Sequence, residues 1–444
     1  MTSTAVLRAD DRRYVWHPFT PMARWLDSEP LVIAAGEGCE LVDTEGNRYL
    51  DGVASLWCNV HGHRHPRLDA ALAEQAGRLA HATMLGLANV PATLLARRLV
   101  EIAPARLTRV FYAGDGASAV EIALKMAFQY WALCGVGGRT KFLRLGEAYH
   151  GDTVGAVSVG GIGVFHRIFG PLTFDTVLAP SPNAYRRPPG RSRAECEEQR
   201  AVAMERLVAD HAGELAAVIV EPLIQAAAGM LTAPPGYLRR VREACDRHDV
   251  LLIVDEVATG FGRTGRMFAC EAEGVQPDLM TLGKGLTGGY LPLSAVLVSD
   301  DVFEAFLGTT FFHGHTFTGN PLSAAVALAS LAVFEEEGTI AALGPKIVLL
   351  ERLLAELVQP LAAVGDVRQC GMMVGIELVA DRASAAPLPP ERRTGDRVCE
   401  LALERGVIMR PLGDVVVLMP PLAISEAQLE RLVAVTAECI AGAT

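Results

Sequence analysis

The sequence contains very little lysine. Of its 40 lysine and arginine residues only four are lysines, namely Lys125, Lys141, Lys284 and Lys346. Lys284 lies between two glycines in TLGKGLTGGYLP, a run with hardly any other polar side chain. Arginine stays charged, whereas burial can lower the pKa of a lysine until its free amine attacks a carbonyl carbon. Lys284 is therefore a candidate for covalent chemistry.

Other absences exclude whole classes of protein. The longest unbroken apolar run, residues 322–334, is too short to cross a bilayer, and residues 1–13 lack the order of a secretory signal. The nine cysteines form no CxxC pair, which argues against a disulfide framework and against zinc. The net charge of −11 is spread along the chain and leaves no basic face for nucleic acid. We expect a cytoplasmic protein that acts on small molecules, with no nucleic-acid or membrane partner.

The pattern of apolar runs predicts an α/β fold. Three short runs are typical of buried strands, at residues 109–112, 217–220 and 251–254. They alternate with helical stretches such as residues 120–131, as in a mostly parallel sheet covered on both faces. Ligands bind at the carboxyl ends of the strands in such sheets, and Gly114, Glu221 and Asp255 fall there.

We expect two domains. A large domain would span residues 60–333, and a small domain would combine residues 1–59 with residues 334–444. The segment EGCELVDTEGNRYLDG predicts a hairpin in the amino-terminal part, with polar turn residues from Asp43 to Asn47. After residue 334 the pattern changes to an amphipathic helix at 340–358, followed by strand-like segments.

One candidate site is the start of the helix in FYAGDGASAVEIALKMAFQYW. A strand and a glycine turn precede this helix, and free backbone N–H groups together with the positive end of the helix dipole form an anion site at such a position. A bound phosphate is one interpretation. Helix capping is the other, because Ser118 and Glu121 have the spacing of a capping box.

Three further motifs could complete a site with the lysine. Asp255 ends an apolar strand in LLIVDEVATGFGRTG, where a buried carboxylate needs a cation or hydrogen-bond donors, although it could simply cap the next turn. In GEAYHGDT, the ring of Tyr149 could lie on a planar cofactor and His150 could transfer protons. In FFHGHTFTGNPLSAA, Thr316 could reach a phosphate.

Taken together, these features predict a pocket for pyridoxal phosphate. In such a pocket the lysine amine bonds to the cofactor, and the aspartate keeps the pyridine nitrogen protonated so that the ring withdraws electrons. Asn320 and Pro321 have the residue types of the N-cap and the first position of the next helix.

The segments VDEVATGFGRTG and TLGKGLTGG resemble the signature of the class III (ω-type) aminotransferases, and the resemblance covers nearly the whole chain. Within that family, WHPFTPM, NVHGHRHP, AYHGDTVGAVSVG, FFHGHTFTGNP and MRPLGDVV resemble the diaminopelargonic acid (adenosylmethionine-8-amino-7-oxononanoate type) aminotransferases. The resemblance implies a fold type I transferase with pyridoxal phosphate as its cofactor, and a homodimer with shared active sites. It also implies conversion of 8-amino-7-oxononanoate into 7,8-diaminononanoate in biotin synthesis.

The resemblance also implies roles for individual residues. The expected catalytic residues are Lys284, which would carry the cofactor, Asp255, which would pair with its pyridinium, and Tyr149, which would stack on its ring. The expected cofactor-binding residues are Gly116, Ala117, Tyr149, Asp255, Lys284, His315 and Thr316, with Thr316 reaching the phosphate of the other subunit. The expected substrate-binding residues are Phe19, Trp57, Tyr149, Lys284, Gly314 and Arg410, with Arg410 on the substrate carboxylate. Arg263 would be a further charge on the substrate side.

Some positions differ from the branch of the family that takes its amino group from S-adenosylmethionine. That branch has tyrosine, tryptophan and tyrosine at the positions of Phe19, Leu56 and Val417, and proline at that of His315. Without these rings and hydroxyls the chain has fewer groups to hold an adenosyl sulfonium, which favours the branch that uses lysine. Both donors stay open. Asp115 also differs, because the family usually has serine at this position beside the phosphate.

Other interpretations are open as well. His61, His63 and His65 alternate along one segment and could bind a metal, although turn and surface roles are more common for such histidines, and we expect no metal. Another class III ω-amine transaminase of specialised metabolism, or an aminomutase, would share every cofactor residue. A non-enzymatic pyridoxal phosphate-binding domain, as in some transcription factors, normally needs an attached DNA-binding module, and neither terminus is long or basic enough for one.

Overall fold

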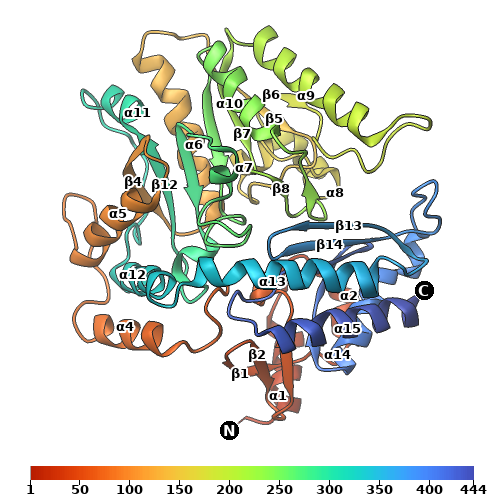
Figure 1. Cartoon of the computed structure of the whole chain (residues 1–444). Helices are drawn as coiled ribbons and strands as arrows, with labels where there is room; N and C mark the ends of the chain where they lie inside the picture. Colours follow the sequence, from red (N-terminus) through yellow and green to blue (C-terminus); the bar gives the residue numbers. More distant parts are fainter. Residues whose placement is uncertain (1) are drawn as a thin grey trace.

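A seven-stranded sheet forms the centre of the protein (Figure 1), and the computed structural model describes residues 2–444. In spatial order its strands are β4 (Leu107–Ala113), β12 (Ser294–Ser299), β11 (Leu279–Leu282), β10 (Leu251–Asp255), β7 (Leu215–Val220), β5 (Lys141–Leu145) and β6 (Thr176–Ala179). Neighbouring strands are parallel, except that β12 runs against both β11 and β4. The predicted α/β fold with a mostly parallel sheet is confirmed.

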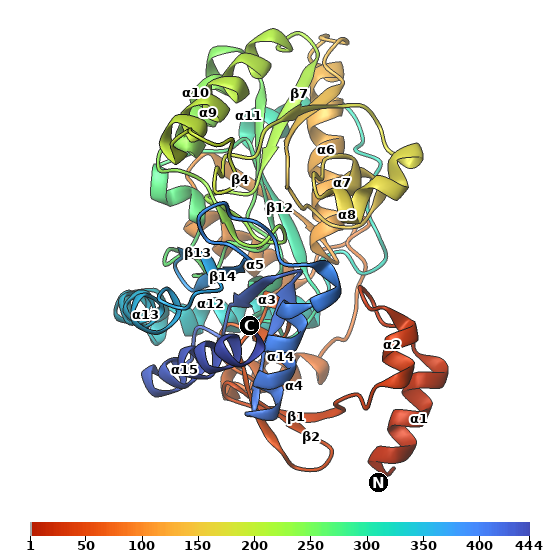
Figure 2. The same cartoon turned by 90° about the vertical axis from the view of Figure 1, so that its right-hand side faces the viewer.

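Helices cover both faces of the central sheet (Figure 2). Helix α6 (Gly116–Leu133) lies along one face, and α9 (Arg193–Asp210) and α10 (Tyr237–Arg247) lie on the other. Every residue of β7 and β10 is consequently buried, which explains why these strands are apolar without alternation. The other helices and short strands of this region are α4 (Pro66–Ala76), α5 (Val90–Ile102), α7 (Val154–Ser158), α8 (Gly163–His166), β8 (Ile224–Gln225), β9 (Leu231–Thr232), α11 (Asp300–Ala305) and α12 (Pro321–Glu336).

The two ends of the chain meet in a second region. Strands β1 (Ile33–Glu37), β2 (Glu40–Asp43) and β3 (Arg48–Asp51) are antiparallel, and β15 (Val407–Ile408) pairs in parallel with β3. A further antiparallel sheet contains β13 (Val364–Cys370), β14 (Met373–Leu378), β17 (Val415–Leu418) and β16 (Arg410–Leu412). In both views the red amino-terminal strands and the blue carboxyl-terminal helices lie together (Figures 1 and 2). The hairpin prediction is confirmed, and the domain boundaries stay a prediction.

The remaining helices belong to these two chain ends. They are α1 (Thr4–Tyr14), α2 (Met22–Asp27), α3 (Ala54–Trp57), α13 (Thr339–Leu353), α14 (Thr394–Glu404) and α15 (Glu426–Ala443). The helix predicted at residues 340–358 is confirmed, with a last turn, Leu354–Val358, that is π-helical. None of the helices within residues 2–444 is both long and apolar enough to cross a membrane.

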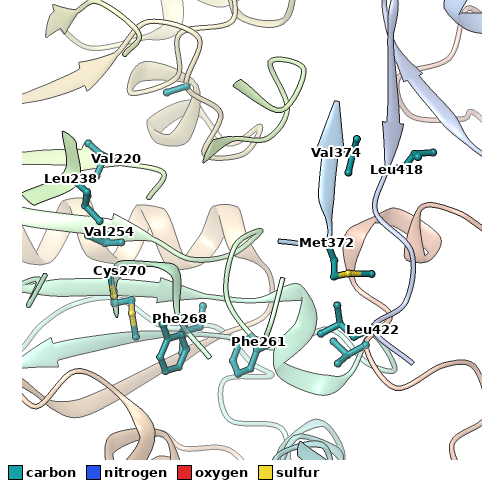
Figure 3. Close-up of a cluster of buried hydrophobic side chains, with 14 of the residues drawn as sticks. Val220, Leu238, Val254, Phe261, Phe268, Cys270, Met372, Val374, Leu418 and Leu422 are labelled. Carbon is teal, nitrogen blue, oxygen red and sulfur yellow. The ribbon is translucent and has the colours of Figure 1, made fainter. Parts of the chain in front are cut away.

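One apolar core connects the central sheet with the carboxyl-terminal sheet (Figure 3). It extends from Val220 and Val254 in the central strands, past Phe261, to Met372 and Leu418. Burial of these side chains stabilises the contact by roughly 2 kcal/mol for each large side chain. The carboxyl ends of the central strands are therefore held against the carboxyl-terminal sheet.

The turn between β13 and β14 approaches the loop after β10 very closely. A Cβ atom on Gly371 would lie 2.5 Å from the carbonyl carbon of Thr264 and 2.6 Å from the carbonyl oxygen of Arg263. The backbone N–H of Met372 donates to that same oxygen at 2.9 Å, and Gly371 has a φ of +63°. Glycine alone fits both the contact and the left-handed backbone without strain.

We predict that Gly371→Ala lowers the free energy of unfolding by about 3 kcal/mol or more, because the methyl group must displace backbone atoms in addition to adopting a positive φ. Gly413→Ala is the matched control, since Gly413 also has a positive φ, +59°, but its Cβ would meet nothing within 4 Å. This control should cost about 1 kcal/mol. Urea unfolding measures both losses, and equal losses would contradict the close contact.

Candidate active site

The carboxyl ends of the central strands open onto a cavity of about 520 Å³. The ends of β7 and β10 supply Glu221 and Asp255, and the loop after β11 supplies Lys284. The cavity is lined by Trp57, Asp115, Gly116, Ala117, Tyr149, His150, Gly151, Asp152, Thr153, Glu221, Ala226, Ala227, Asp255, Val257, Ala258 and Lys284. Six of the residues predicted for the site thus meet here, namely Trp57, Gly116, Ala117, Tyr149, Asp255 and Lys284.

Lys284 begins a single 3₁₀ turn directly after β11. Its φ of +40° is unfavourable for a residue with a side chain, and such backbone strain is typical of functional positions. Burial lowers the pKa of Lys284, although the nearby carboxylates of Asp255 and Glu221 oppose this effect. Its Nζ lies 5.9 Å from the centre of the Trp57 ring. The amine is consequently more easily deprotonated, and hence more nucleophilic, than a lysine in water.

Val257 packs between two glycines and so brings the lysine loop to the start of α6. A Cβ atom on Gly116 would lie 2.7 Å from Cγ1 of Val257, and one on Gly283 would lie 3.3 Å from the same atom. On the other side, a Cβ on Gly151 would lie 2.4 Å from the Cβ of Ala117. A side chain at Gly116 or Gly151 would therefore clash with its neighbour, whereas one at Gly283 would need only a small shift of Val257.

Asp255 is buried and surrounded by hydrogen-bond donors. Its Oδ2 lies 2.7 Å from Nδ1 of His150, and its Oδ1 accepts from the hydroxyl of Thr281 at 2.9 Å and from the backbone N–H of Val257 at 3.1 Å. These donors offset the cost of burying a carboxylate. The capping role considered from the sequence is present in the bond to Val257, but the other donors and the cavity show that Asp255 does more than cap a turn.

Tyr149 is held by carboxylates at both ends. Its hydroxyl donates to Asp152 at 2.6 Å, and its backbone N–H donates to Glu221 at 3.0 Å. The His166 ring is nearly parallel to the Tyr149 ring, with centres 6.3 Å apart and planes 11° apart. His166 is buried, and neither of its ring nitrogens has a hydrogen-bond partner among residues 2–444. The tyrosine ring is therefore fixed in place at the cavity wall.

Glu221 is a second buried carboxyl group of the cavity. Burial raises its pKa to about 7, and neighbouring His150 and the N–H of Tyr149 act in the opposite direction. Its oxygens accept from the backbone N–H groups of Tyr149 and Ala226, each at 3.0 Å. Glu221 can therefore exchange a proton near neutral pH.

The start of α6 differs from the capping box considered from the sequence. The N-cap is Asp115, whose carboxylate accepts from the backbone N–H and the hydroxyl of Ser118, both at 2.9 Å. Glu121 instead accepts from the backbone N–H of Gly155 at 2.7 Å. The capping-box interpretation is therefore wrong, because it placed the helix start three residues too late. The N–H groups of Gly116 and Ala117, in the first turn, have no acceptor within the helix and line the cavity.

Trp57 reaches the cavity from a strained turn. Ala54, Ser55 and Trp57 all have positive φ angles, of 49°, 61° and 65°. The buried carboxylate of Asp51 holds this turn by accepting from the backbone N–H groups of Val53 at 3.2 Å and Ser55 at 2.8 Å. Hydrogen bonds to a buried carboxylate thus offset backbone strain that places an aromatic ring near Lys284.

Five predicted site residues lie outside the cavity lining. Phe19 is exposed, and its ring centre lies 5.4 Å from that of Phe165, which in turn is 6.2 Å from that of Tyr149. His315 lies beside Gly114, because a Cβ there would be 3.5 Å from its ring. The others, Gly314, Thr316 and Arg410, are exposed. Asn320 and Pro321 do form the predicted N-cap and first residue of α12.

Arg263 is fully buried between the two regions of the chain. Its guanidinium donates to the backbone carbonyls of Asn59 and Pro420, each at 2.6 Å, and burial lowers its pKa to about 10. It therefore ties the loop after β10 to both chain ends. Its predicted place on the substrate side is still a prediction.

The three alternating histidines have separate partners. His61 contacts Ser330, His63 contacts Asp51 and His65 contacts Glu337, at 3.0, 3.0 and 3.1 Å. Among the described residues, 2–444, no group of three or more histidine, cysteine or acidic side chains is arranged to hold a metal ion.

Sequence reasoning missed or undervalued several residues of the site. From the sequence Glu221 is only a strand end, although an acid that directly follows a buried strand can indicate a titrating group. Asp152 lies in GEAYHGDT, and nothing in that motif indicates that it binds the hydroxyl of Tyr149. His166 and Phe165 carry no signal in the sequence, because their relation to Tyr149 depends on how α8 folds back.

Comparison with known proteins identifies relatives over nearly the whole chain. The family model described as "Aminotransferase class-III" matches residues 22–440. A relative from Nitratidesulfovibrio vulgaris named adenosylmethionine-8-amino-7-oxononanoate aminotransferase is 56% identical over 97% of this chain and 80% of its own length. One of the same name from Geobacter sulfurreducens is 53% identical over 97% of this chain and 96% of its own length.

Solved structures agree with these sequence relatives. The crystal structure of adenosylmethionine-8-amino-7-oxononanoate aminotransferase from Methanocaldococcus jannaschii superposes with a TM-score of 0.94 at 46% identity, covering 99% of each chain. A thermostable (S)-enantioselective omega-transaminase from Thermomicrobium roseum gives a TM-score of 0.95 at 36% identity, covering 100% of this chain and 99% of that chain.

We predict that Glu221→Gln makes the protein more stable than the wild type at pH 8 but not at pH 4.5. Burial raises the pKa of Glu221 from 4.5 to about 7. The folded wild type is therefore not penalised below pH 4.5, where Glu221 is neutral in both the folded and the unfolded state, and it loses stability as the pH rises through about 7 and the buried group must ionise. The difference should reach roughly 3 kcal/mol. Urea unfolding across this range measures it, with the exposed Glu430→Gln as a control. A difference that does not change with pH would contradict the burial argument.

Proposed function

The chain belongs to the class III aminotransferases, and we propose that it transfers an amino group to the ketone of 8-amino-7-oxononanoate, giving 7,8-diaminononanoate in biotin synthesis. The observation that carries this proposal is one cavity that combines a lysine amine of lowered pKa with the buried carboxylate of Asp255. The proposed substrate rests on the names of the relatives, and the proposed reaction type rests on the residues of the cavity.

Pyridoxal phosphate is the cofactor of this aminotransferase. When bound, it supplies an aldehyde that can accept an amino group and a ring that withdraws electrons from the reacting carbon. The residues of the cavity fit this group, because Lys284 offers an amine, Asp255 offers a carboxylate for a protonated ring nitrogen, and the start of α6 offers two unpaired N–H groups for a phosphate. The glycines packed on Val257 bring the loop of Lys284 close to that helix start.

Two residues carry the proton chemistry in this proposal. Lys284 would hold the cofactor through its amine, and the free amine would move a proton at the reacting carbon, as its lowered pKa favours. Asp255 is fixed by His150 and Thr281 so that its carboxylate stabilises positive charge on the cofactor ring. Tyr149 provides a flat face for that ring.

The wall beside the cavity fits the chain of the proposed substrate. An apolar cluster there contains Trp57, Ile162, Ala226, Val417 and Met419. Such a wall suits the methylene chain of 8-amino-7-oxononanoate. Arg410 is exposed on β16 and, in this proposal, grips the carboxylate at the far end of the substrate with its planar guanidinium.

The amino donor is lysine or S-adenosylmethionine. The side chains of Phe19, Leu56 and Val417 offer no hydroxyl and only one aromatic ring, and they favour lysine because an adenosyl sulfonium gains from aromatic and polar partners. The alternative function is that of an ω-amine transaminase of another pathway. Such an enzyme would use the same cofactor residues but would have other side chains where the substrate binds.

We further propose that two copies of the chain share their active sites. Leu85, Phe312 and Phe317 are 73%, 85% and 61% exposed, which is unusual for large apolar side chains. The segments around Leu85 and Phe317 lie side by side, since Gly314 approaches Leu85 and the rings of His81 and Phe317 are 5.1 Å apart. A second copy would cover this surface and would bring Thr316 to the phosphate of its partner. We place the enzyme in the cytoplasm, in keeping with its nine free cysteines.

The function is tested with purified enzyme, 8-amino-7-oxononanoate and either lysine or S-adenosylmethionine. We expect 7,8-diaminononanoate with at least one donor, and more with lysine. Lys284→Ala should lose both turnover, by at least roughly a thousandfold, and the visible absorbance of bound cofactor, because no covalent bond can form. Lys141→Ala, which removes a half-buried lysine paired with Glu214, should keep both. Turnover by Lys284→Ala, or no product from either donor, would refute the proposal.

Shared active sites can be tested by mixing two inactive subunits. In a mixed dimer of Lys284→Ala and Thr316→Ala chains, one site would receive both defects and the other would receive Lys284 and Thr316 intact. We expect activity at limiting cofactor to recover to about a quarter of the wild-type value, since half the dimers in a random mixture are mixed. If Thr316 served its own subunit, every site would carry a defect and no activity would return.

A further inference from the structure

Asp115 places a negative charge at the end of the cavity where a phosphate is expected. Its carboxylate is exposed, lines the cavity and caps α6. Its backbone is fixed there, because its carbonyl oxygen accepts from the hydroxyl of Ser294 at 2.6 Å. The carboxylate is thus held beside the N–H groups of Gly116 and Ala117 that face the cavity.

The first turn of α6 offers the phosphate no side-chain donor. Gly116 and Ala117 have none, and the hydroxyl of Ser118 is bonded to Asp115 at 2.9 Å. Within one copy of the chain the phosphate would therefore depend on backbone N–H groups and the helix dipole, and in the proposed dimer Thr316 of the second copy would add one hydroxyl. The carboxylate of Asp115 already accepts a hydrogen bond from the first turn of α6 and offsets part of the positive charge at the helix start. It therefore competes with a phosphate for the same end of the helix.

The cavity contains little positive charge to offset this acid. Within the described part of the chain, Lys284 is the only lysine or arginine among the residues that line it, against the four acids Asp115, Asp152, Glu221 and Asp255. Lys284 is also the group that bonds to the cofactor aldehyde. A phosphate ester carries close to two negative charges at neutral pH, so it meets a site of its own sign.

We propose that Asp115 weakens the hold on the cofactor phosphate, so that the cofactor exchanges with solution when it is not bonded to Lys284. This inference rests on the proposed function. The exchange matters in the half of the cycle after the donor has reacted, when the cofactor carries the amino group and no covalent bond retains it. Enzyme activity would then depend on the concentration of free cofactor.

The test is the rate at which the holoenzyme loses its cofactor. The enzyme is first treated with the amino donor alone, and release of pyridoxamine phosphate is then followed by rapid gel filtration and cofactor fluorescence. Asp115→Asn is the decisive variant, because asparagine caps a helix as well as aspartate but carries no charge. We expect release to become roughly tenfold slower, as for the loss of one repulsive charge near a protein surface.

Two further comparisons separate charge from structure. Asp115→Ser, which also provides a capping oxygen, should slow release similarly, and the exposed Glu430→Gln should leave it unchanged. High salt should reduce the difference between wild type and Asp115→Asn, because exposed charges are screened. Release that is equal or faster in Asp115→Asn overturns this inference alone. A wild-type enzyme that binds no cofactor, or does not react with any donor, overturns the proposed function and this inference with it.

Discussion

The buried carboxylate of Asp255 is the group on which the site depends. A charge at the end of a buried strand is costly unless donors surround it. The donors come from segments far apart in the chain, since His150 follows β5, Val257 follows β10 and Thr281 belongs to β11. Hydrogen bonds to this one carboxylate therefore connect the carboxyl ends of β5, β10 and β11, and β11 leads into Lys284. The hydrogen bond from Thr281 that helps to offset the burial of Asp255 thus also positions the loop that carries Lys284.

Backbone strain is concentrated around this cavity. Lys284 and the turn from Ala54 to Trp57 adopt positive φ angles, although their side chains disfavour them. Gly116 and Gly283, the latter next to Lys284, pack against Val257, and Gly371 packs against the backbone of Arg263 and Thr264. Packing of the large core, which extends through both parts of the chain, supplies the free energy that maintains the strained segments.

The charged side chains of the cavity have different roles. Lys284 and Glu221 share one cavity, and burial lowers the pKa of the amine but raises the pKa of the carboxyl group, because it disfavours the charged form of each. Lys284 becomes a better nucleophile, and Glu221 can carry a proton at neutral pH. The same excess of acid reaches the start of α6, where Asp115 opposes the binding of an anion. Proton transfer and retention of the cofactor are thus linked through one electrostatic environment.

The sequence by itself determined the fold class, the buried strands and the meeting of Asp255, Tyr149 and Lys284, because apolar runs and strand ends follow local rules and motifs preserve residue types. One of its two interpretations of the segment before α6, a capping box at Ser118, misplaced the helix start, and it gave no sign of His166, since caps and stacking partners depend on which segments pack together. Only the tertiary structure decided that Arg263 binds two backbone carbonyls and that Glu221 is buried enough to titrate near pH 7. Burial and hydrogen bonding are properties of the surroundings, and those surroundings exist only once distant segments have packed together.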